Sequence, residues 1–167
     1  MKKFLPSFVS GFGAGVLSVV PVIKTFACCL IIPAAATLSI LLYQRAENVD
    51  EKIETGKAIF LGVFTGLFAA LFATTFEIFI TLFTKQNDLI AAFGNMQSMI
   101  NSFPLDDHLK QEVIDLINMV VTELKTTGFS VIYSFTLLFN NLVINSIFGL
   151  AGGVIGLQII NAKYKNR

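Results

Sequence analysis

The segment FGLAGGVIGLQ, residues Phe148–Gln158, carries glycine at four positions within an otherwise apolar run. In a soluble helix each glycine costs about 1 kcal/mol relative to alanine, which disfavours this composition. Within lipid, helices associate mainly through close packing, and glycine allows two backbones to approach each other. The segment therefore predicts a membrane helix with a face of small residues.

Glycines four residues apart recur in three of the four apolar segments of the chain. This spacing places both members of a pair on one helix face. Three such faces predict a compact helical bundle, and we favour packing within one chain over packing between chains. The expected helix-packing residues are Gly11, Gly15, Gly62, Gly66, Gly149, Gly152, Gly153 and Gly156.

The composition also indicates a membrane protein. Hydrophobic residues make up 54% of the 167 residues and charged residues 14%, whereas soluble domains carry about 25% charged residues. The formal net charge of +1 gives no basic surplus for nucleic-acid binding. We expect the lipid bilayer to be one partner and other membrane subunits, or further copies of this chain, to be the others.

Four apolar segments, approximately 7–23, 26–43, 58–83 and 129–160, are candidate membrane spans. A helix needs about 20 apolar residues to cross the hydrocarbon core, which the last two segments exceed. The first two are at the short end of the range and form either a spanning hairpin, which we favour, or a re-entrant pair. The sequence thus predicts an all-α fold with one membrane domain, 1–167, built as a four-helix bundle.

Two prolines lie in the first pair of segments. Pro21 is expected to help stop the first helix, and Pro33 is expected to kink the second. The positively charged start, followed by an apolar run, resembles a signal peptide, but Lys24 interrupts the approach to the only cleavage-like sequence. We therefore expect the first segment to be retained.

The distribution of Lys and Arg predicts the orientation, because these residues are enriched in cytoplasmic loops. With both termini in the cytoplasm, eight basic residues lie inside and four lie outside. The abundance of Lys, Asn, Ile and Phe suggests an AT-rich bacterial genome, so we expect a multi-pass protein of the bacterial inner membrane. The inner basic residues are Lys2, Lys3, Arg45, Lys52, Lys57, Lys163, Lys165 and Arg167.

The long connection 86–128 lies outside the membrane in this orientation and predicts an amphipathic helical hairpin. Apolar residues recur every three or four positions on either side of Pro104, and Gly128 is a suitable end for the second helix. From Lys85 to Gly128 the acidic residues outnumber the lysines by six to three, which favours packing on protein over binding to anionic lipid. The two stripes consist of Leu89, Phe93, Met96, Ile100 and Phe103, and of Leu109, Val113, Leu116, Ile117, Val120 and Leu124.

Glu77 is the one acidic residue inside a predicted span, which makes it a functional-site hypothesis by default. Tyr133, Ser134 and Thr136 are expected at a similar depth, and Lys24 is a further candidate partner. We favour an interhelical contact that determines packing. The alternative is a proton or cation site at Glu77.

Asn140, Asn141 and Asn145 form a second polar group, and the last two share a helix face. We expect them to hold helices together rather than to bind a substrate. Together with Glu77 and Lys24, they make up the candidate intramembrane polar site.

The cysteines, the histidine and the methionines are expected to have structural or solvated roles rather than chemical ones. The adjacent Cys28 and Cys29 do not have the spacing of a zinc site, and we expect them to be inert. His108 is expected to be solvated at a helix start. The methionines Met96, Met99 and Met119 follow the apolar stripes, which favours core packing over a copper or partner site. No catalytic or phosphate-binding motif is present, so we expect no enzyme activity, no metal and no cofactor.

Three segments, GFGAGVLS (11–18), TGKAIFLGVFTGL (55–67) and FGLAGGVIGL (148–157), resemble those of a family of small bacterial four-span membrane proteins of unknown function. The resemblance implies a helical excursion outside the membrane and a basic tail, and it brings no assigned activity or site residue. We expect a structural or accessory subunit of a homo-oligomer or larger membrane complex. The alternative is a small proton- or cation-coupled transporter or channel that uses Glu77.

Overall fold

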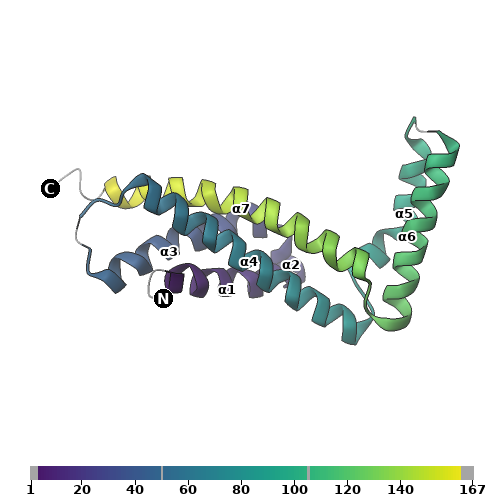
Figure 1. The fold of residues 1–167 in the computed structure, drawn as a ribbon, viewed down its shortest axis with the longest axis horizontal. Coiled ribbons are helices and arrows are strands. Elements are labelled where there is room, and N and C mark those ends of the chain that lie inside the picture. Colours follow the sequence, from purple (N-terminus) through teal and green to yellow (C-terminus); the bar gives the residue numbers. More distant parts are fainter. Residues whose placement is uncertain (1–3, 50, 105, 163–167) are drawn as a thin grey trace. The chain divides into compact units, whose positions relative to one another are not determined.

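The computed structural model describes residues 4–49, 51–104 and 106–162 (Figure 1). The structure is 88% helical, and the described ranges contain no strand, which confirms the all-α class. The chain forms two compact units. Unit 1 comprises the chain up to Phe76 and from Leu137 onward, and unit 2 is Glu77–Thr136. The basic residues predicted inside near the ends (Lys2, Lys3, Lys163, Lys165 and Arg167) lie outside the described ranges.

The long helices are α4 (Thr55–Thr84) and α7 (Val131–Ala162), each of which begins or ends in unit 2. Unit 1 also contains α1 (Leu5–Ser18), the short α2 (Pro21–Lys24) and the π-helical turn η2 (Ala27–Ile31), which leads directly into α3 (Ile32–Glu47). Unit 2 contains α5 (Asp88–Ser102) and α6 (Asp107–Thr127).

Three helical segments among the described residues are long and apolar enough to cross a membrane: Ala27–Glu47, Thr55–Thr84 and Val131–Ala162, with 21, 30 and 32 residues. They support a membrane-spanning helical protein. Helix α1 has 14 residues, which is about 21 Å at 1.5 Å per residue, less than the hydrocarbon core of about 30 Å.

The prediction of one continuous helix over 7–23 is wrong, because the segment forms two separate helices. Helix α1 ends at Ser18, and Pro21 is the first residue of α2 rather than part of the same helix. A proline fits this position because its missing N–H would have no partner in the first helical turn. Pro33 likewise lies in the first turn of α3, directly after η2.

Helices α1 and α4 run parallel in unit 1. The Phe4 ring lies near Phe60, and further along both helices Phe12 lies near Phe76. Helix α3 runs opposite to α1, because Ser7 near the start of α1 contacts Ser39 in the second half of α3.

Helix α7 runs opposite to α4. Gly153 approaches Ala58, whereas Asn141, earlier in α7, bonds to Thr74, later in α4. The start of α1, the α3–α4 connection and the end of α7 therefore lie at the same end of unit 1 (Figure 1).

Part of the interior of unit 1 is built mainly from small residues. One buried cluster combines Ala14, Ile32, Ala35 and Ala69 from three helices. Small side chains keep the backbones close, so dispersion contacts form between main chains as well as side chains. A second buried cluster, at the end that holds the α3–α4 connection, consists of Ile40, Tyr43, Ile53, Ala58, Leu61, Leu157 and Ile160.

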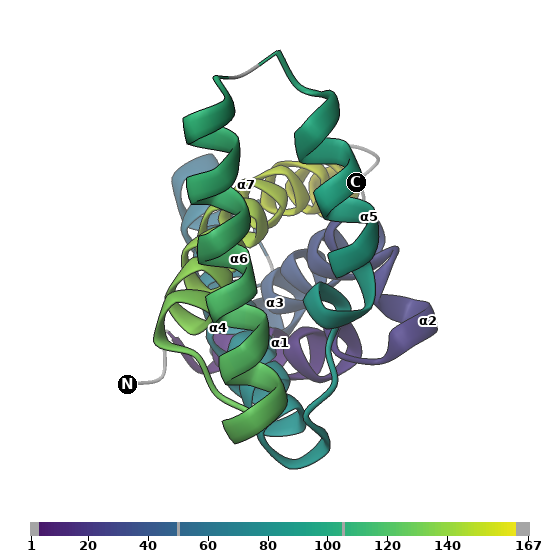
Figure 2. The same ribbon diagram turned by 90° about the vertical axis from the view of Figure 1, so that its right-hand side faces the viewer.

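In unit 2, α5 and α6 form an antiparallel pair (Figure 2). The Asn87 carboxamide accepts a hydrogen bond from the Ile90 N–H and caps α5. Helix α5 ends at Ser102, before Pro104. Helix α6 ends at Thr127 and is capped by Gly128, whose φ of 78° favours glycine. The sequence predicted two helices with a break at Pro104 and a stop at Gly128, and the structure agrees.

The apolar stripe of α6 is covered along only part of its length. Val120 and Leu124 are buried, whereas Leu109 and Leu116 remain about half exposed. The expectation that the methionines serve core packing is wrong for Met99 and Met119, because both are exposed. The uncovered half of this stripe is the part farther from the α6 C-terminus.

Candidate functional site

Glu77 contacts the start of α7. The Tyr133 hydroxyl donates a hydrogen bond of 3.0 Å to Glu77 Oε1, and both side chains are half-buried in unit 2. Of the three α7 residues expected near Glu77, Ser134 donates to the carbonyl oxygen of Ser130, the residue before the helix. The Glu77–Tyr133 pair joins α4 to α7.

A second polar contact joins the same helices within unit 1. Asn141 Nδ2 donates to Thr74 Oγ1 at 2.9 Å, and the Thr74 side chain is buried. Asn145, one turn later in α7, is also buried, and its carbonyl group lies against Gly66. The Asn141 side chain and the Asn145 backbone thus both contact α4.

The other two members of the predicted polar site are Asn140 and Lys24. Asn140 is exposed on another face of α7. Lys24 ends α2 in unit 1, whereas Glu77 belongs to unit 2, so their pairing stays a prediction. Within unit 1, Asn141 thus reaches α4, whereas the Asn140 side chain is exposed.

Glycines on α4 and α7 meet backbone to backbone. A Cβ added to Gly62 would collide with the carbonyl oxygen of Gly149, and one added to Gly149 would collide with that of Gly62. At Gly66 the obstacle is the carbonyl of Asn145. A Cβ on Gly153 would lie 2.6 Å from the carbonyl oxygen of Ala58. Only glycine permits this separation of the two helices.

The other predicted packing glycines contact different helices of the same unit. Gly11 and Gly15 on α1 face α4, where an added Cβ would lie 2.6 Å from the Cβ of Phe68 or Phe72. Gly152 faces the backbone of Pro33 on α3, and Gly156 faces Thr37, also on α3. All eight glycines therefore pack within one chain.

Phenylalanine rings of α1 and α4 form a ladder of contacts, which was not predicted from the sequence. Phe8 lies 5.4 Å from both Phe68 and Phe72, and Phe12 lies 5.0 Å from Phe72, measured between ring centroids with edge-to-face geometry. The signal was present in the sequence: phenylalanine occurs at every fourth position of α4, at 60, 64, 68, 72 and 76. This spacing places the rings on one face.

Two further polar contacts were also not predicted. Ser7 Oγ lies 3.1 Å from both Ser39 Oγ and the Leu61 carbonyl oxygen, which joins three helices through one buried hydroxyl. The side chain of Asn161 accepts from the Ile53 N–H at 3.0 Å and donates to the Ile53 carbonyl at 3.1 Å. No sequence pattern marks these pairs, because their members are far apart along the chain.

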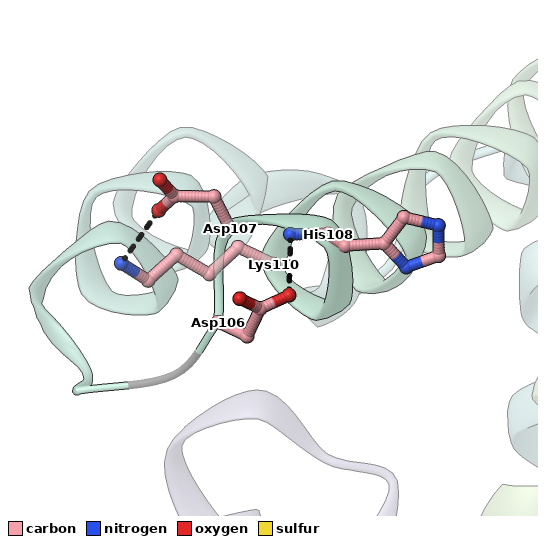
Figure 3. Close-up of polar contacts among 4 residues, drawn as sticks. All are labelled: Asp106, Asp107, His108 and Lys110. Carbon is pink, nitrogen blue, oxygen red and sulfur yellow. Dashed lines mark hydrogen bonds and ion pairs between the residues drawn. The ribbon is translucent and has the colours of Figure 1, made fainter.

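Cys29 and His108 are exposed, whereas Cys28 is half-buried. The sulfur atoms of Cys28 and Cys29 are 3.7 Å apart within η2, and both thiols are free. His108 is exposed at the start of α6, where Asp106 Oδ2 accepts a hydrogen bond from its backbone N–H at 3.1 Å (Figure 3). This contact is a helix cap. Residues 4–49, 51–104 and 106–162 contain no group of three His, Cys, Asp or Glu side chains that would hold a metal ion.

Lys110 Nζ lies 3.4 Å from Asp107 Oδ1 on the same exposed turn (Figure 3). Because the Asp107 side chain is fully exposed, this ion pair contributes little to stability. The acidic start of α6 thus has a local structural role.

Comparison with known proteins adds no functional assignment: no family model, no curated protein and no solved structure matches the chain.

Proposed function

We propose that this chain is a structural or accessory subunit, without catalytic activity, of a homo-oligomer or larger complex in a membrane. The observation that carries the proposal is the glycine contact between α4 and α7. Gly62 and Gly149 bring two backbones together so closely that neither position accepts a Cβ. Such packing favours a rigid membrane scaffold, because any change in helix separation would break many close contacts at once.

The proposed topology has four spans, with α1 as the shortest. Although α1 is about 21 Å long, the apolar Val19 and Val20 extend beyond it, and a short span is accommodated by local bilayer thinning. The antiparallel order of α1, α3, α4 and α7 is consistent with four crossings. The alternative, a re-entrant pair formed by the first two segments, predicts that a tag inserted in the turn before Lys24 lies on the same side of the membrane as both termini.

The proposed location is a bacterial inner membrane with both termini in the cytoplasm and the α5–α6 hairpin outside. Arg45, Lys52 and Lys57 lie near the α3–α4 connection, and Lys57 Nζ lies 5.1 Å above the Tyr43 ring. An aromatic ring and a basic side chain are typical of the polar boundary of a membrane. Protease accessibility of a tag inserted at Gly94 in sealed cells tests the placement of the hairpin.

Mild extraction followed by native mass measurement tests the subunit proposal. We expect a defined assembly larger than the 18.3 kDa chain, with lipid retained. Recovery of the chain only as a lone monomer, both at native expression levels and after gentle detergent exchange, would overturn the proposal.

A second candidate function is a small proton- or cation-coupled transporter or channel. The Tyr133–Glu77 hydrogen bond supports it, because a carboxyl group inside a membrane helix is expensive and is often retained for ion or proton movement. In this case Glu77→Gln abolishes a pH- or cation-driven flux in liposomes while the helical content is unchanged. Equal flux in both proteins, or none in the wild type, would eliminate this function.

A further inference from the structure

The exposed amide of Asn140 differs from the other polar groups of α7. Its neighbour Asn141 bonds to Thr74 on α4, and Asn145 is buried. The Asn140 side chain, in contrast, is exposed and makes no hydrogen bond to any residue of the described ranges. Among the described residues, the donor and the acceptor of this amide therefore both remain available.

Asn140 lies at membrane depth. Helix α7 has 32 residues, or about 48 Å, and Asn140 is about 14 Å from its first residue at 1.5 Å per residue. A hydrocarbon core of about 30 Å centred on α7 begins about 9 Å from each end of the helix. An unpaired amide facing lipid there is costly, because lipid tails offer no hydrogen-bond partner.

The residues that follow Asn140 on the same face form an exposed apolar seam. Val143, Ile147 and Leu150 are 42%, 58% and 43% exposed. Together with Asn140 they are spaced three, four and three residues apart, which is the spacing of helices that pack side by side with a slight supercoil. A single asparagine in such a seam sets the register and number of the packed helices.

The most suitable partner for this seam is a second copy of the same chain. Copies of one membrane protein insert with the same orientation, so a two-fold axis between them runs along the membrane normal and places each residue opposite itself at equal depth. An asparagine amide both donates and accepts, so it pairs with its own symmetry mate. A different protein would need its own polar group at this depth.

We propose that two copies of the chain associate through α7, with the two Asn140 amides hydrogen-bonded to each other and the Val143, Ile147 and Leu150 side chains packed around them. The inference rests on the proposed function as a self-assembling structural subunit, which it deepens by naming the interface.

Dimerisation of the full chain, measured by energy transfer between labelled copies in phosphatidylcholine–phosphatidylglycerol vesicles, tests this interface. Asn140→Leu removes the amide and keeps the apolar seam, and we expect it to weaken association roughly 3- to 30-fold. Thr75→Leu is the matched control, because Thr75 is also exposed on a long helix but its hydroxyl bonds to its own helix at Leu71. This control is expected to associate like the wild type, and both variants are expected to retain wild-type thermal stability.

Disulfide cross-linking gives an independent readout. In a Cys28→Ala, Cys29→Ala background, Asn140→Cys and Ile147→Cys are expected to form dimers on mild oxidation, whereas Leu71→Cys on α4 is not. Equal association of wild type and Asn140→Leu, or cross-linking at Leu71 without cross-linking at Asn140, would overturn the α7 interface. If either result is found but a defined assembly is still recovered from native membranes, the α7 interface is wrong and the proposed subunit function stands. The failure of the interface is thus distinguishable from the failure of the proposed function.

Discussion

Replacing Gly153 by alanine tests whether the separation of α4 and α7 depends on the absence of side chains. A Cβ at this position would lie 2.6 Å from the Ala58 carbonyl oxygen and 3.3 Å from the Gly62 Cα. Ordinary contact distances begin near 3.4 Å, so the two backbones must separate by about 0.8 Å to accept the methyl group. Both obstacles are main-chain atoms, which a change of side-chain rotamer does not relieve.

The expected change in the free energy of unfolding is the difference between two opposing contributions. Overpacking of a tight contact costs about 1–3 kcal/mol, whereas alanine stabilises a helix by up to about 1 kcal/mol relative to glycine. Gly13→Ala isolates the second term, because Gly13 is also helical in unit 1 and an added Cβ there meets no atom within 4 Å. Gly153→Ala is therefore expected to be less stable than Gly13→Ala by about 1–3 kcal/mol, which is roughly a 5- to 150-fold shift in the unfolding equilibrium.

Equilibrium unfolding in a mild detergent, followed by circular dichroism and tryptic cleavage, measures this difference. The two variants share the same chemical change, so effects on the unfolded chain largely cancel in the comparison. Equal stability of Gly153→Ala and Gly13→Ala would refute the claim that close backbone contact between α4 and α7 holds the bundle together.

Three other substitutions test separate contacts. Asn161→Leu removes both hydrogen bonds to the Ile53 backbone, so hydrogen exchange of the Ile53 amide, measured by mass spectrometry, is expected to accelerate. An unchanged exchange rate at Ile53 would contradict the contact. Tyr133→Phe removes the hydroxyl that bonds to Glu77 and is expected to lower the free energy of unfolding in detergent by about 0.5–1.5 kcal/mol. An unchanged free energy of unfolding would contradict the hydrogen bond. Gly128→Ala forces a side chain into a φ of 78° and is expected to lower the thermal unfolding midpoint, whereas a raised midpoint would exclude strain at this position.

Much of the helical organisation was predictable because it depends on local signals. The run of apolar residues from Ala58 to Phe83 predicted α4, and the break at Pro104 with the end at Gly128 predicted the helices of the hairpin. Capping and apolar periodicity act over a few residues, so they are readable along the chain. The first segment was harder to predict, because its composition does not reveal that the helix ends at Ser18 and restarts at Pro21.

The candidate polar site was predictable in its members but not in its arrangement. Sequence alone places Asn140, Asn141 and Asn145 within two turns of one helix. It does not determine how α7 is rotated against α4, and that rotation leaves Asn140 exposed while Asn141 reaches Thr74. Glu77 and Tyr133 are 56 residues apart, so their hydrogen bond also depends on how two separate helices meet.

The sequence by itself determined that this chain is helical, apolar and rich in glycine pairs with helical spacing, because these properties follow from composition and from the pitch of one helix. Only the tertiary structure decided which glycine faces which backbone, how the phenylalanine ladder of α1 and α4 interlocks, and that Ser7 joins three helices. The physical reason is that packing depends on the relative rotation and height of helices that lie far apart in the chain. Many rotations bury similar apolar area, and the close fit of main-chain atoms selects one of them.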